Sequence, residues 1–370
     1  MTERRLGIIV SGATGRMGRM HHLPALLAMR AEGGLPLRNG DRLVPDILLH
    51  GRDGARLAAL AESLGISDYT TDLDQALSDP AYELFFDTAL TETRPVVLAK
   101  AIEAGKNIYT EKPVAHSVEQ GRRILKLAEA RGVKHGAVED KLYMPGIIAL
   151  RSLRDQGFFG RITKFHIEFG AWVFDGTDIP AQRASWNYRK DKNGGIMLDM
   201  FPHWRYVIED LLGRVEEFVS ASWTATPERI DERGERYQGD VEDTGECLLK
   251  LDGGIRGSIA SSWATRTWQN RFTLHIDGTG GSAQASYEKC SVQPAAKPAP
   301  GGKGAVETPW SELTLPPQQT NYRLAWEAFL RYLVEDAPFK SDLKAGVRDV
   351  QFGELNRQSV KERRWVTFPA

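Results

Sequence analysis

Residues 6–18 read Leu-Gly-Ile-Ile-Val-Ser-Gly-Ala-Thr-Gly-Arg-Met-Gly, an apolar run that passes directly into a turn with three regularly spaced glycines. The run predicts a buried strand, and the pattern over 17–30 predicts the helix that follows it. Glycines at this position allow a tight turn and let the backbone approach a pyrophosphate at the helix N-terminus. The stretch therefore predicts a dinucleotide-binding turn rather than a purely structural one. We expect cofactor contacts from Gly12, Thr14, Gly15, Arg16 and Met17.

Short apolar runs and helical patterns alternate from residue 6 to about 140, which is typical of a parallel sheet covered on both faces. Further strands are expected at 47–50, 84–87, 107–109 and 133–138, with helices at 55–64, 94–104 and 118–131. This pattern predicts an α/β domain with a doubly wound Rossmann sheet over 1–142. Residues 31–45, rich in Gly, Pro and Asn, predict a long loop that serves as a lid or a subunit contact.

Beyond residue 160 the sequence changes to alternating, strand-like segments. These predict strands at 162–169, 217–223, 246–251, 255–262, 272–276 and 282–286. Residues 291–320, with repeated Pro, Ala and Gly, predict a loop or an extended crossing, and helical patterns return at 323–335 and 347–362. We therefore expect a second, α+β domain over 143–370 with a largely antiparallel sheet, whose terminal helix is able to pack back on the first domain.

The residues after the second expected strand bear on the choice of cofactor. NAD enzymes commonly carry an acidic residue there for the ribose 2′-hydroxyl, whereas NADP enzymes use a small residue and an arginine. Here the sequence is His50-Gly51-Arg52-Asp53, so Gly51 and Arg52 favour NADP, with Arg52 paired to the 2′-phosphate. Two alternatives stay open. In the first, Arg52 is a solvated residue and Asp53 caps the next helix. In the second, a shift by one residue gives Asp53 the NAD role.

The composition limits the classes of partner. The formal net charge of -1 provides no basic field for nucleic acid or for an anionic membrane. No apolar stretch approaches the roughly 18 residues of a membrane-spanning helix. The 2 cysteines are too few for a disulfide framework and lack the spacing of a metal site. We therefore expect a cytoplasmic protein with a small-molecule partner and no metal.

Two more motifs, residues 109–113 (Tyr-Thr-Glu-Lys-Pro) and 194–203 (Gly-Gly-Ile-Met-Leu-Asp-Met-Phe-Pro-His), accompany the glycine turn. Together they resemble the glucose-fructose oxidoreductase / inositol dehydrogenase (Gfo/Idh/MocA) family, and the resemblance covers nearly the whole chain. Further matches are 157–162, 277–282 and 365–369. The resemblance implies a Rossmann domain, a second domain with an open sheet used for oligomer contacts in a homodimer or homotetramer, and oxidation or reduction of sugars, cyclitols or related compounds.

The resemblance also implies site residues. It makes Lys112, Asp199 and His203 the catalytic set that meets nicotinamide and substrate, with Glu111 and Lys112 also near the cofactor. Oxidation of an alcohol needs a base for the hydroxyl proton, and a histidine suits that task, so His203 is our candidate. Asp199 lies four positions earlier, on the same face if the segment is one helix. However, Pro202 requires that a helix kinks there or begins there.

Other residues concern the substrate. The donors and rings over 182–189 predict contacts to a polyhydroxylated ring, and we name Arg183, Tyr188 and Lys141, together with Asp199 and His203, as substrate-binding candidates. Packing of Tyr188 in the core or an oligomer interface is an equal alternative.

The chain departs from the family pattern at two places, both of which concern substrate choice. Arg94 stands where the family has a histidine, and Lys141-Leu142-Tyr143 replaces an Arg-Phe pair.

These observations predict an NAD(P)-dependent dehydrogenase or reductase that transfers hydride between its cofactor, with NADP favoured, and a secondary hydroxyl or ketone of a sugar, sugar derivative or cyclitol. Two other functions are compatible with a dinucleotide-binding fold. One is an NAD-dependent glycosidase that works by transient oxidation. The other is a non-catalytic dinucleotide sensor, against which the joint presence of Lys112, Asp199 and His203 argues.

Overall fold

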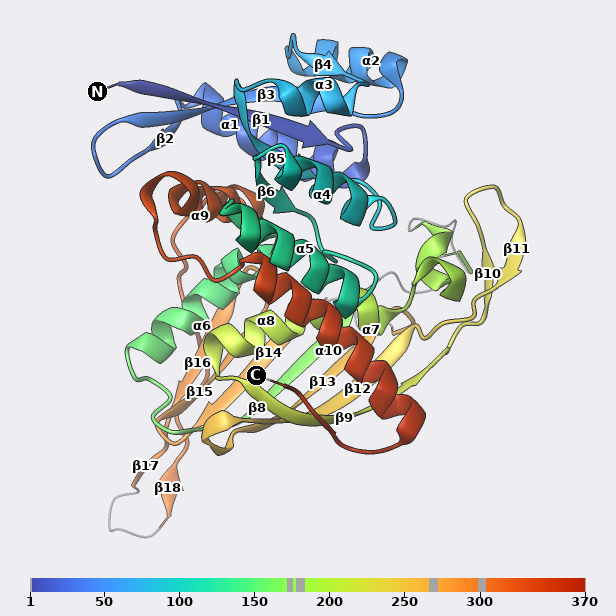
Figure 1. Ribbon diagram of the computed structural model, residues 1–370. Helices are drawn as coiled ribbons and strands as arrows, with labels where there is room; N and C mark the ends of the chain where they lie inside the picture. The colour runs from blue at the N-terminus through green and yellow to red at the C-terminus, as the bar shows by residue number, and fades with distance from the viewer. Residues whose placement is uncertain (1, 172–175, 178–183, 266–271, 299–303, 370) are drawn as a thin grey trace. The chain divides into compact units, whose positions relative to one another are not determined.

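The computed structural model describes residues 2–171, 176–177, 184–265, 272–298 and 304–369 (Figure 1). The chain divides into two compact units. The first contains residues 1–143 and 319–350, and the second contains 144–318 and 351–370. The expected boundary after residue 142 lies one residue from the observed one. Residues 319–350 belong to the first unit, although the sequence analysis places them in the second domain.

The first unit is built on a seven-stranded sheet. Its strands are β1 (Glu3–Ser11), β2 (Leu35–Pro36), β3 (Arg42–His50), β4 (Tyr69–Thr70), β5 (Tyr82–Asp87), β6 (Asn107–Thr110) and β7 (His135–Ala137). The order is β2-β3-β1-β5-β6-β7, with β4 also on β3, and all pairs are parallel except β2 with β3. This parallel arrangement confirms the expected Rossmann sheet.

Helices cover both faces of this sheet, as a buried parallel sheet requires. They are α1 (Leu23–Ala31), α2 (Gly54–Leu64), α3 (Leu73–Ser78), α4 (Arg94–Glu103), α5 (Val118–Arg131), α9 (Asn321–Glu335) and the first part of α10 (Leu343–Glu362). Successive residues of β1 face opposite sides, so Ile8 and Val10 join one apolar cluster and Ile9 joins the other. Helices α1 and α9 contribute to the first cluster, and α4 and α5 to the second.

The expected helix over 17–30 is not a uniform α-helix. Residues Gly18–His22 form a π-helical turn before α1 begins at Leu23. His22, at the end of this turn, is 1% exposed. The sequence pattern does not distinguish i→i+5 from i→i+4 bonding, and such π-turns are frequent at functional sites.

The loop expected over 31–45 is partly a hairpin. Strand β2 pairs antiparallel with the start of β3, and β3 begins at Arg42 rather than at residue 47. Pro45 lies within β3, opposite Leu6 of β1. On the other edge of β3, β2 pairs only before Pro45 and β4 only after it. A proline is tolerated at such an unpaired edge. Because a proline in a sequence ordinarily argues against a strand, the sequence did not predict the longer strand.

The second unit contains a nine-stranded sheet in the order β19-β16-β15-β14-β8-β13-β12-β9-β20. Its strands are β8 (Ile162–Gly170), β9 (Val215–Trp223), β12 (Thr244–Leu251), β13 (Arg256–Ser262), β14 (Phe272–Gly278), β15 (Gly281–Ala285), β16 (Cys290–Pro294), β19 (Ser311–Glu312) and β20 (Val366–Thr367). All pairs are antiparallel except β8 with β13, which confirms the expected, largely antiparallel sheet. Strands β10 (Glu228–Ile230) and β11 (Arg236–Gln238) form a separate hairpin.

Helices α6 (Pro145–Asp155) and α8 (Phe201–Leu211) pack on this sheet, with the short α7 (Ile196–Asp199) beside α8 (Figure 1). The later part of α10 covers the same sheet, since Phe352 packs edge-on against Phe218 of β9 with ring centroids 4.9 Å apart. Among the described helices, none combines the length and the apolar character that a membrane span needs.

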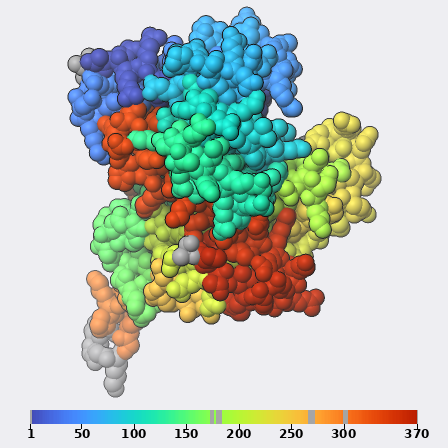
Figure 2. Space-filling view, in the orientation of Figure 1, coloured from blue at the N-terminus to red at the C-terminus, as the bar shows by residue number. Residues whose placement is uncertain are grey.

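The expectation of a loop over 291–320 was only partly right. Strand β16 extends to Pro294 and pairs with β15 and β19. Strands β17 (Lys297–Pro298) and β18 (Ala305–Val306) form an exposed hairpin that projects from the surface (Figure 2). These strands are short and rich in Pro and Ala, so their pairing depends on the neighbouring strand rather than on local propensity.

Candidate functional site

The glycine turn between β1 and α1 requires glycine for steric reasons. Gly12 has φ +75°, and a Cβ added there would lie 2.7 Å from the backbone nitrogen of Ala89. A Cβ on Gly18 would lie 2.9 Å from the carbonyl oxygen of Ala13. Both contacts are closer than real Cβ atoms approach, so the backbone folds tightly only without side chains at these positions.

Two neighbouring strands hold this turn in place. The backbone nitrogens of Gly12 and Ala13 both donate to the carbonyl oxygen of His50, at 3.0 and 3.2 Å. From the end of β5, the Thr88 hydroxyl donates to the carbonyl oxygens of Ser11 and Gly12, each at 3.0 Å. The turn is therefore fixed at the carboxyl edge of the sheet, where doubly wound folds bind their ligands.

The outer part of the turn remains accessible. Thr14, Gly15 and Met17 are half-buried and Arg16 is exposed, whereas Ala13 is fully buried. The first amides of a helix lack intrahelical acceptors, and here they follow a turn without bulky side chains. A pyrophosphate fits such a cradle, and Gly12, Thr14, Gly15, Arg16 and Met17 are the residues that would hold it.

The segment after β3 carries the groups expected to select the cofactor. Gly51 is buried, and Arg52 is exposed. Asp53 is the N-cap of α2, and its Oδ1 accepts a hydrogen bond from the Arg56 backbone nitrogen at 3.1 Å. Asp53 thus caps the helix, which by itself leaves the role of Arg52 open. Gly51, directly after the strand, has no carboxylate. The carboxylate of Asp53, two positions later, already accepts a hydrogen bond from the helix that it caps.

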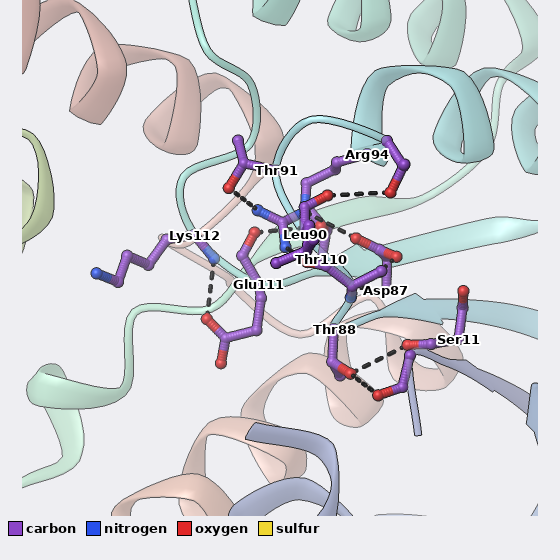
Figure 3. A network of polar contacts seen from close by, with 12 residues as sticks. Ser11, Asp87, Thr88, Leu90, Thr91, Arg94, Thr110, Glu111 and Lys112 are labelled. Carbon is purple, nitrogen blue, oxygen red and sulfur yellow. Dashed lines mark hydrogen bonds and ion pairs between the residues drawn. The ribbon is translucent and has the colours of Figure 1, made fainter. Parts of the chain in front are cut away.

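Glu111 and Lys112 follow β6 at the same edge. The backbone nitrogen of Glu111 donates to the carbonyl oxygen of Asp87 at 2.8 Å, which continues the pairing of β5 with β6. The Glu111 carboxylate is buried, and its Oε2 accepts from the backbone nitrogen of Lys112 at 3.0 Å. Figure 3 shows the Lys112 side chain extending away from this carboxylate. Glu111 thus supports the backbone at Lys112.

Arg94, at the start of α4, has a structural role that the sequence did not indicate. Its side chain is 2% exposed and donates from Nε to Asp87 Oδ2 at 2.7 Å (Figure 3). It also donates to the carbonyl oxygens of Ala89, at 2.6 Å, and Pro113, and to the Thr91 hydroxyl. The guanidinium therefore connects the loop after β5 with the segment that carries Lys112. Its place in the family pattern had suggested an influence on the substrate instead.

Asp199 and His203 lie at a junction of two helices in the second unit. Asp199 is the last residue of α7, and α8 begins at Phe201 with Pro202 in its first turn. Of the two alternatives for Pro202, the helix therefore begins there. His203 is 4% exposed, and its Nδ1 lies 2.5 Å from the Tyr206 hydroxyl, one turn later. This hydrogen bond orients the imidazole ring.

The double glycine before α7 allows a close approach of three chain segments. Gly195 has φ +111°, and its added Cβ would lie 2.4 Å from Glu242 Oε1. A Cβ on Gly194 would lie 2.4 Å from the carbonyl oxygen of Asn187. The same carbonyl accepts from the Gly195 nitrogen at 2.8 Å, and the Ile196 nitrogen donates to the Glu242 carbonyl at 3.0 Å. These contacts fix where α7 starts, and hence where Asp199 stands.

The substrate-side candidates differ in their surroundings. Lys141 Nζ lies 2.6 Å from Asp140 Oδ2, so its charge is paired. Tyr188 is 2% exposed, with the Arg229 guanidinium 3.7 Å from its ring centroid and the Trp263 ring edge-on at 5.3 Å. Its ring is thus packed against the side chains of Arg229 and Trp263. Arg183 lies outside the described residues.

The candidate residues are distributed over both units. The glycine turn, Arg52, Glu111, Lys112 and Lys141 belong to the first unit, and Tyr188, Asp199 and His203 to the second. In the described part of the chain, no group of three or more His, Cys, Asp or Glu side chains is arranged to hold a metal ion.

Two models of known protein families match the chain. Residues 6–138 match the model of an oxidoreductase family with an NAD-binding Rossmann fold, and residues 147–284 match the GFO/IDH/MocA C-terminal domain. The fold and the glycine turn thus define a dinucleotide-binding oxidoreductase. The chain belongs to the Gfo/Idh/MocA family.

Among its relatives is a D-xylose dehydrogenase of Paenarthrobacter nicotinovorans, which is 39% identical over 98% of this chain and 97% of its own. Solved structures share the fold as well. A levoglucosan dehydrogenase in complex with NADH and levoglucosan has a TM-score of 0.84 at 19% identity, and covers 99% of this chain and 100% of its own. An NAD-binding oxidoreductase of Klebsiella pneumoniae has a TM-score of 0.85 at 21% identity, with the same coverage.

Proposed function

We propose that this protein is a nicotinamide-dependent sugar dehydrogenase whose substrate is D-xylose. The observation that carries the proposal is the similarity to the D-xylose dehydrogenase, which extends over nearly the full length of both chains. The glycine turn supports the cofactor part, because a tight turn before a helix N-terminus lets the backbone approach a pyrophosphate.

We further propose that NADP is the preferred cofactor. The end of β3 supports this preference, since Gly51 provides no carboxylate for a ribose 2′-hydroxyl and Asp53 is engaged as a helix cap. Arg52 is exposed beside them and carries the donors that a 2′-phosphate would accept. NAD is the alternative, and the levoglucosan dehydrogenase of the same fold was solved with NADH.

In the proposed reaction three side chains act on the sugar hydroxyl. His203 takes the proton of the sugar hydroxyl, and its hydrogen bond to Tyr206 holds the ring in one orientation. The Lys112 ammonium stabilises the alkoxide, and Asp199 holds the substrate hydroxyl. The oxidised nicotinamide, when bound, supplies the hydride acceptor. Lys141, Arg183 and Tyr188 remain proposed as substrate contacts.

The experiment is a nicotinamide absorbance assay on the purified protein with D-xylose and a panel of other pentoses, hexoses and cyclitols, each with NADP and with NAD. We expect D-xylose with NADP to give the highest kcat/KM. Preference for another sugar would overturn the substrate, and preference for NAD would overturn the cofactor. Cofactor binding without turnover of any sugar would favour a sensor. Cleavage of a glycoside without net change in nicotinamide absorbance would favour the glycosidase.

The roles of the side chains are tested in the same assay. Lys112→Ala and His203→Ala should retain dinucleotide binding and lose kcat by roughly 100-fold or more, which is typical of a lost general base or electrostatic group. If either variant binds cofactor and turns over normally, the role proposed for that residue is wrong.

We also propose assembly through the sheet of the second unit. Trp223 of β9 and Leu248 of β12 are 46% and 55% exposed, and the strand register places both on the same face. Exposed apolar side chains gathered on a sheet face are typical of an interface. Leu248→Glu should shift the protein toward monomers in size-exclusion chromatography with light scattering, and a wild-type monomer would contradict the proposal.

A further inference from the structure

Three hydrogen bonds connect α9 with the backbone of Lys112, all within the first unit. Trp326 Nε1 of α9 lies 3.1 Å from His22 Nδ1. The other ring nitrogen, His22 Nε2, lies 2.8 Å from Glu111 Oε1, and Glu111 Oε2 accepts from the Lys112 backbone nitrogen at 3.0 Å. The side chains of Trp326, His22 and Glu111 are all buried, so water does not compete for these bonds.

The indole of Trp326 fixes the donor and the acceptor in each of these three hydrogen bonds. An indole nitrogen only donates, so Nδ1 of His22 must accept and the ring hydrogen stands on Nε2. Nε2 therefore donates to Glu111, and both carboxylate oxygens act as acceptors. Burial by itself raises the pKa of Glu111, but the hydrogen bond from His22, with Lys112 and Arg94 nearby, brings that pKa below its ordinary value. Glu111 is thus held as a carboxylate.

Aromatic packing fixes the plane of the His22 ring. Its centroid lies 4.5 Å from that of Phe86 and 5.0 Å from that of Tyr322. The π-helical turn Gly18–His22 brings the ring into this position, directly after the glycine turn. The ring therefore has neither rotational freedom nor a second tautomer that would satisfy Trp326.

We propose that His22, held as the Nε2-H tautomer by Trp326, is a positioning residue for Lys112. By donating to one oxygen of Glu111, it orients the carboxylate so that the other oxygen holds the Lys112 amide, and thereby fixes where the Lys112 side chain begins. The inference rests on the proposed role of Lys112 in the reaction. A displacement of about 1 Å of such a group can lower the rate by roughly 100-fold without loss of binding.

The first test compares three variants by steady-state kinetics and dinucleotide titration. His22→Leu removes the donor to Glu111, and we expect kcat to fall by about 10- to 100-fold, with the Kd for the dinucleotide and the KM for sugar changed by less than about threefold. His22→Gln retains an amide donor and should recover most of kcat. Trp326→Phe keeps an aromatic ring but removes the indole donor, and we expect an intermediate loss of kcat. Normal kcat in His22→Leu would overturn the proposal.

The second test reads the tautomer directly. In protein labelled with 15N in histidine, the His22 ring should show the Nε2-H pattern, and its signals are assigned by their absence in His22→Gln. Trp326→Phe should introduce the Nδ1-H form. An Nδ1-H ring in the wild type would overturn the proposal, and this test does not depend on turnover.

A matched control separates positioning from stability. His135 is a half-buried histidine of the first unit, and its Nδ1 accepts from the Leu343 backbone nitrogen at 3.2 Å. His135→Leu should lower the midpoint of thermal unfolding as His22→Leu does, but leave kcat unchanged. An equal loss of kcat in both variants would overturn the proposal. If His22→Leu does not fold, His22→Gln and Trp326→Phe decide by the same criteria.

Lys112→Ala, measured beside these variants, distinguishes a failure of the role proposed for Lys112 from a failure of the positioning role proposed for His22. If it retains normal turnover, the proposed function of Lys112 fails. If it loses turnover while His22→Leu does not, only the positioning role fails.

Discussion

Arg94 Nε lies 2.7 Å from Asp87 Oδ2, and both side chains are buried, at 2% and 0% exposure. The pair connects the start of α4 to the end of β5, and the same guanidinium also bonds to the carbonyl oxygen of Pro113, next to Lys112. A buried pair of this kind adds little to stability over an apolar pair. However, removal of one partner leaves an uncompensated charge.

Arg94→Met should therefore lower the free energy of unfolding by about 3–5 kcal/mol, because the Asp87 carboxylate stays buried without its partner. Denaturant unfolding at neutral pH measures the change. Arg123→Met is the control, since its pair with Glu119 is exposed at both ends and should change stability by less than about 1 kcal/mol. Equal effects of the two substitutions would show that the Arg94 pair is not buried in solution.

Glu111 should contribute a pH-dependent part of the stability. Its folded-state pKa is lowered from the ordinary value of 4.5, so the contribution is fully present above about pH 4.5 and is lost as the pH falls through the folded-state pKa. The difference in unfolding free energy between wild type and Glu111→Gln should be constant near neutral pH and shrink in acid. Denaturant unfolding across this range measures it, and a difference that grows in acid would contradict the direction of the shift.

Gly12→Ala should impair the binding of the dinucleotide. The added methyl group would meet the Ala89 backbone at 2.7 Å and displace the turn, so we expect the affinity to fall by about tenfold or more, equivalent to about 1.4 kcal/mol. Gly105→Ala is a close control, because Gly105 also has φ +75° but has no neighbouring atom within 4 Å of an added Cβ. Both variants carry the backbone strain of about 1–2 kcal/mol, and only Gly12→Ala should weaken binding.

Arg52→Ala should change the choice of cofactor. Hydrogen bonds to charged groups contribute about 1.5–3 kcal/mol each, so the affinity for NADPH should fall by roughly tenfold or more while the affinity for NADH changes little. Fluorescence titration with both cofactors measures this. Arg56→Ala is the control, since Arg56 is exposed in the first turn of α2 and contributes only its backbone nitrogen to the cap. A parallel loss for both cofactors would assign Arg52 a different role.

The sequence predicted local features reliably wherever short-range chemistry decides them. Helix α5 was expected over 118–131 and forms there, because Ser117 caps its start and Gly132 ends it with φ +64°. The strands of the Rossmann sheet were visible as apolar runs, since both faces of a parallel sheet are buried. Asp53 was named as a helix cap, although the sequence could not choose between that role and a cofactor contact.

Other features were decided by contacts between distant segments. The β2–β3 hairpin and the strands within 291–320 lack strong local propensity and form because a partner strand is present. The buried positions of Arg94 and His22 had no signal in the sequence, because a polar side chain is buried only where partners from other segments satisfy it.

The sequence alone determined the class of fold, the glycine turn and the segments that carry Lys112, Asp199 and His203, since these depend on residue type and spacing along the chain. The tertiary structure decided what holds the backbone at Lys112. The indole of Trp326, the imidazole of His22 and the carboxylate of Glu111 come from three separate segments. Their hydrogen bonds gain a fixed direction only when folding buries them together and removes water as the competing partner.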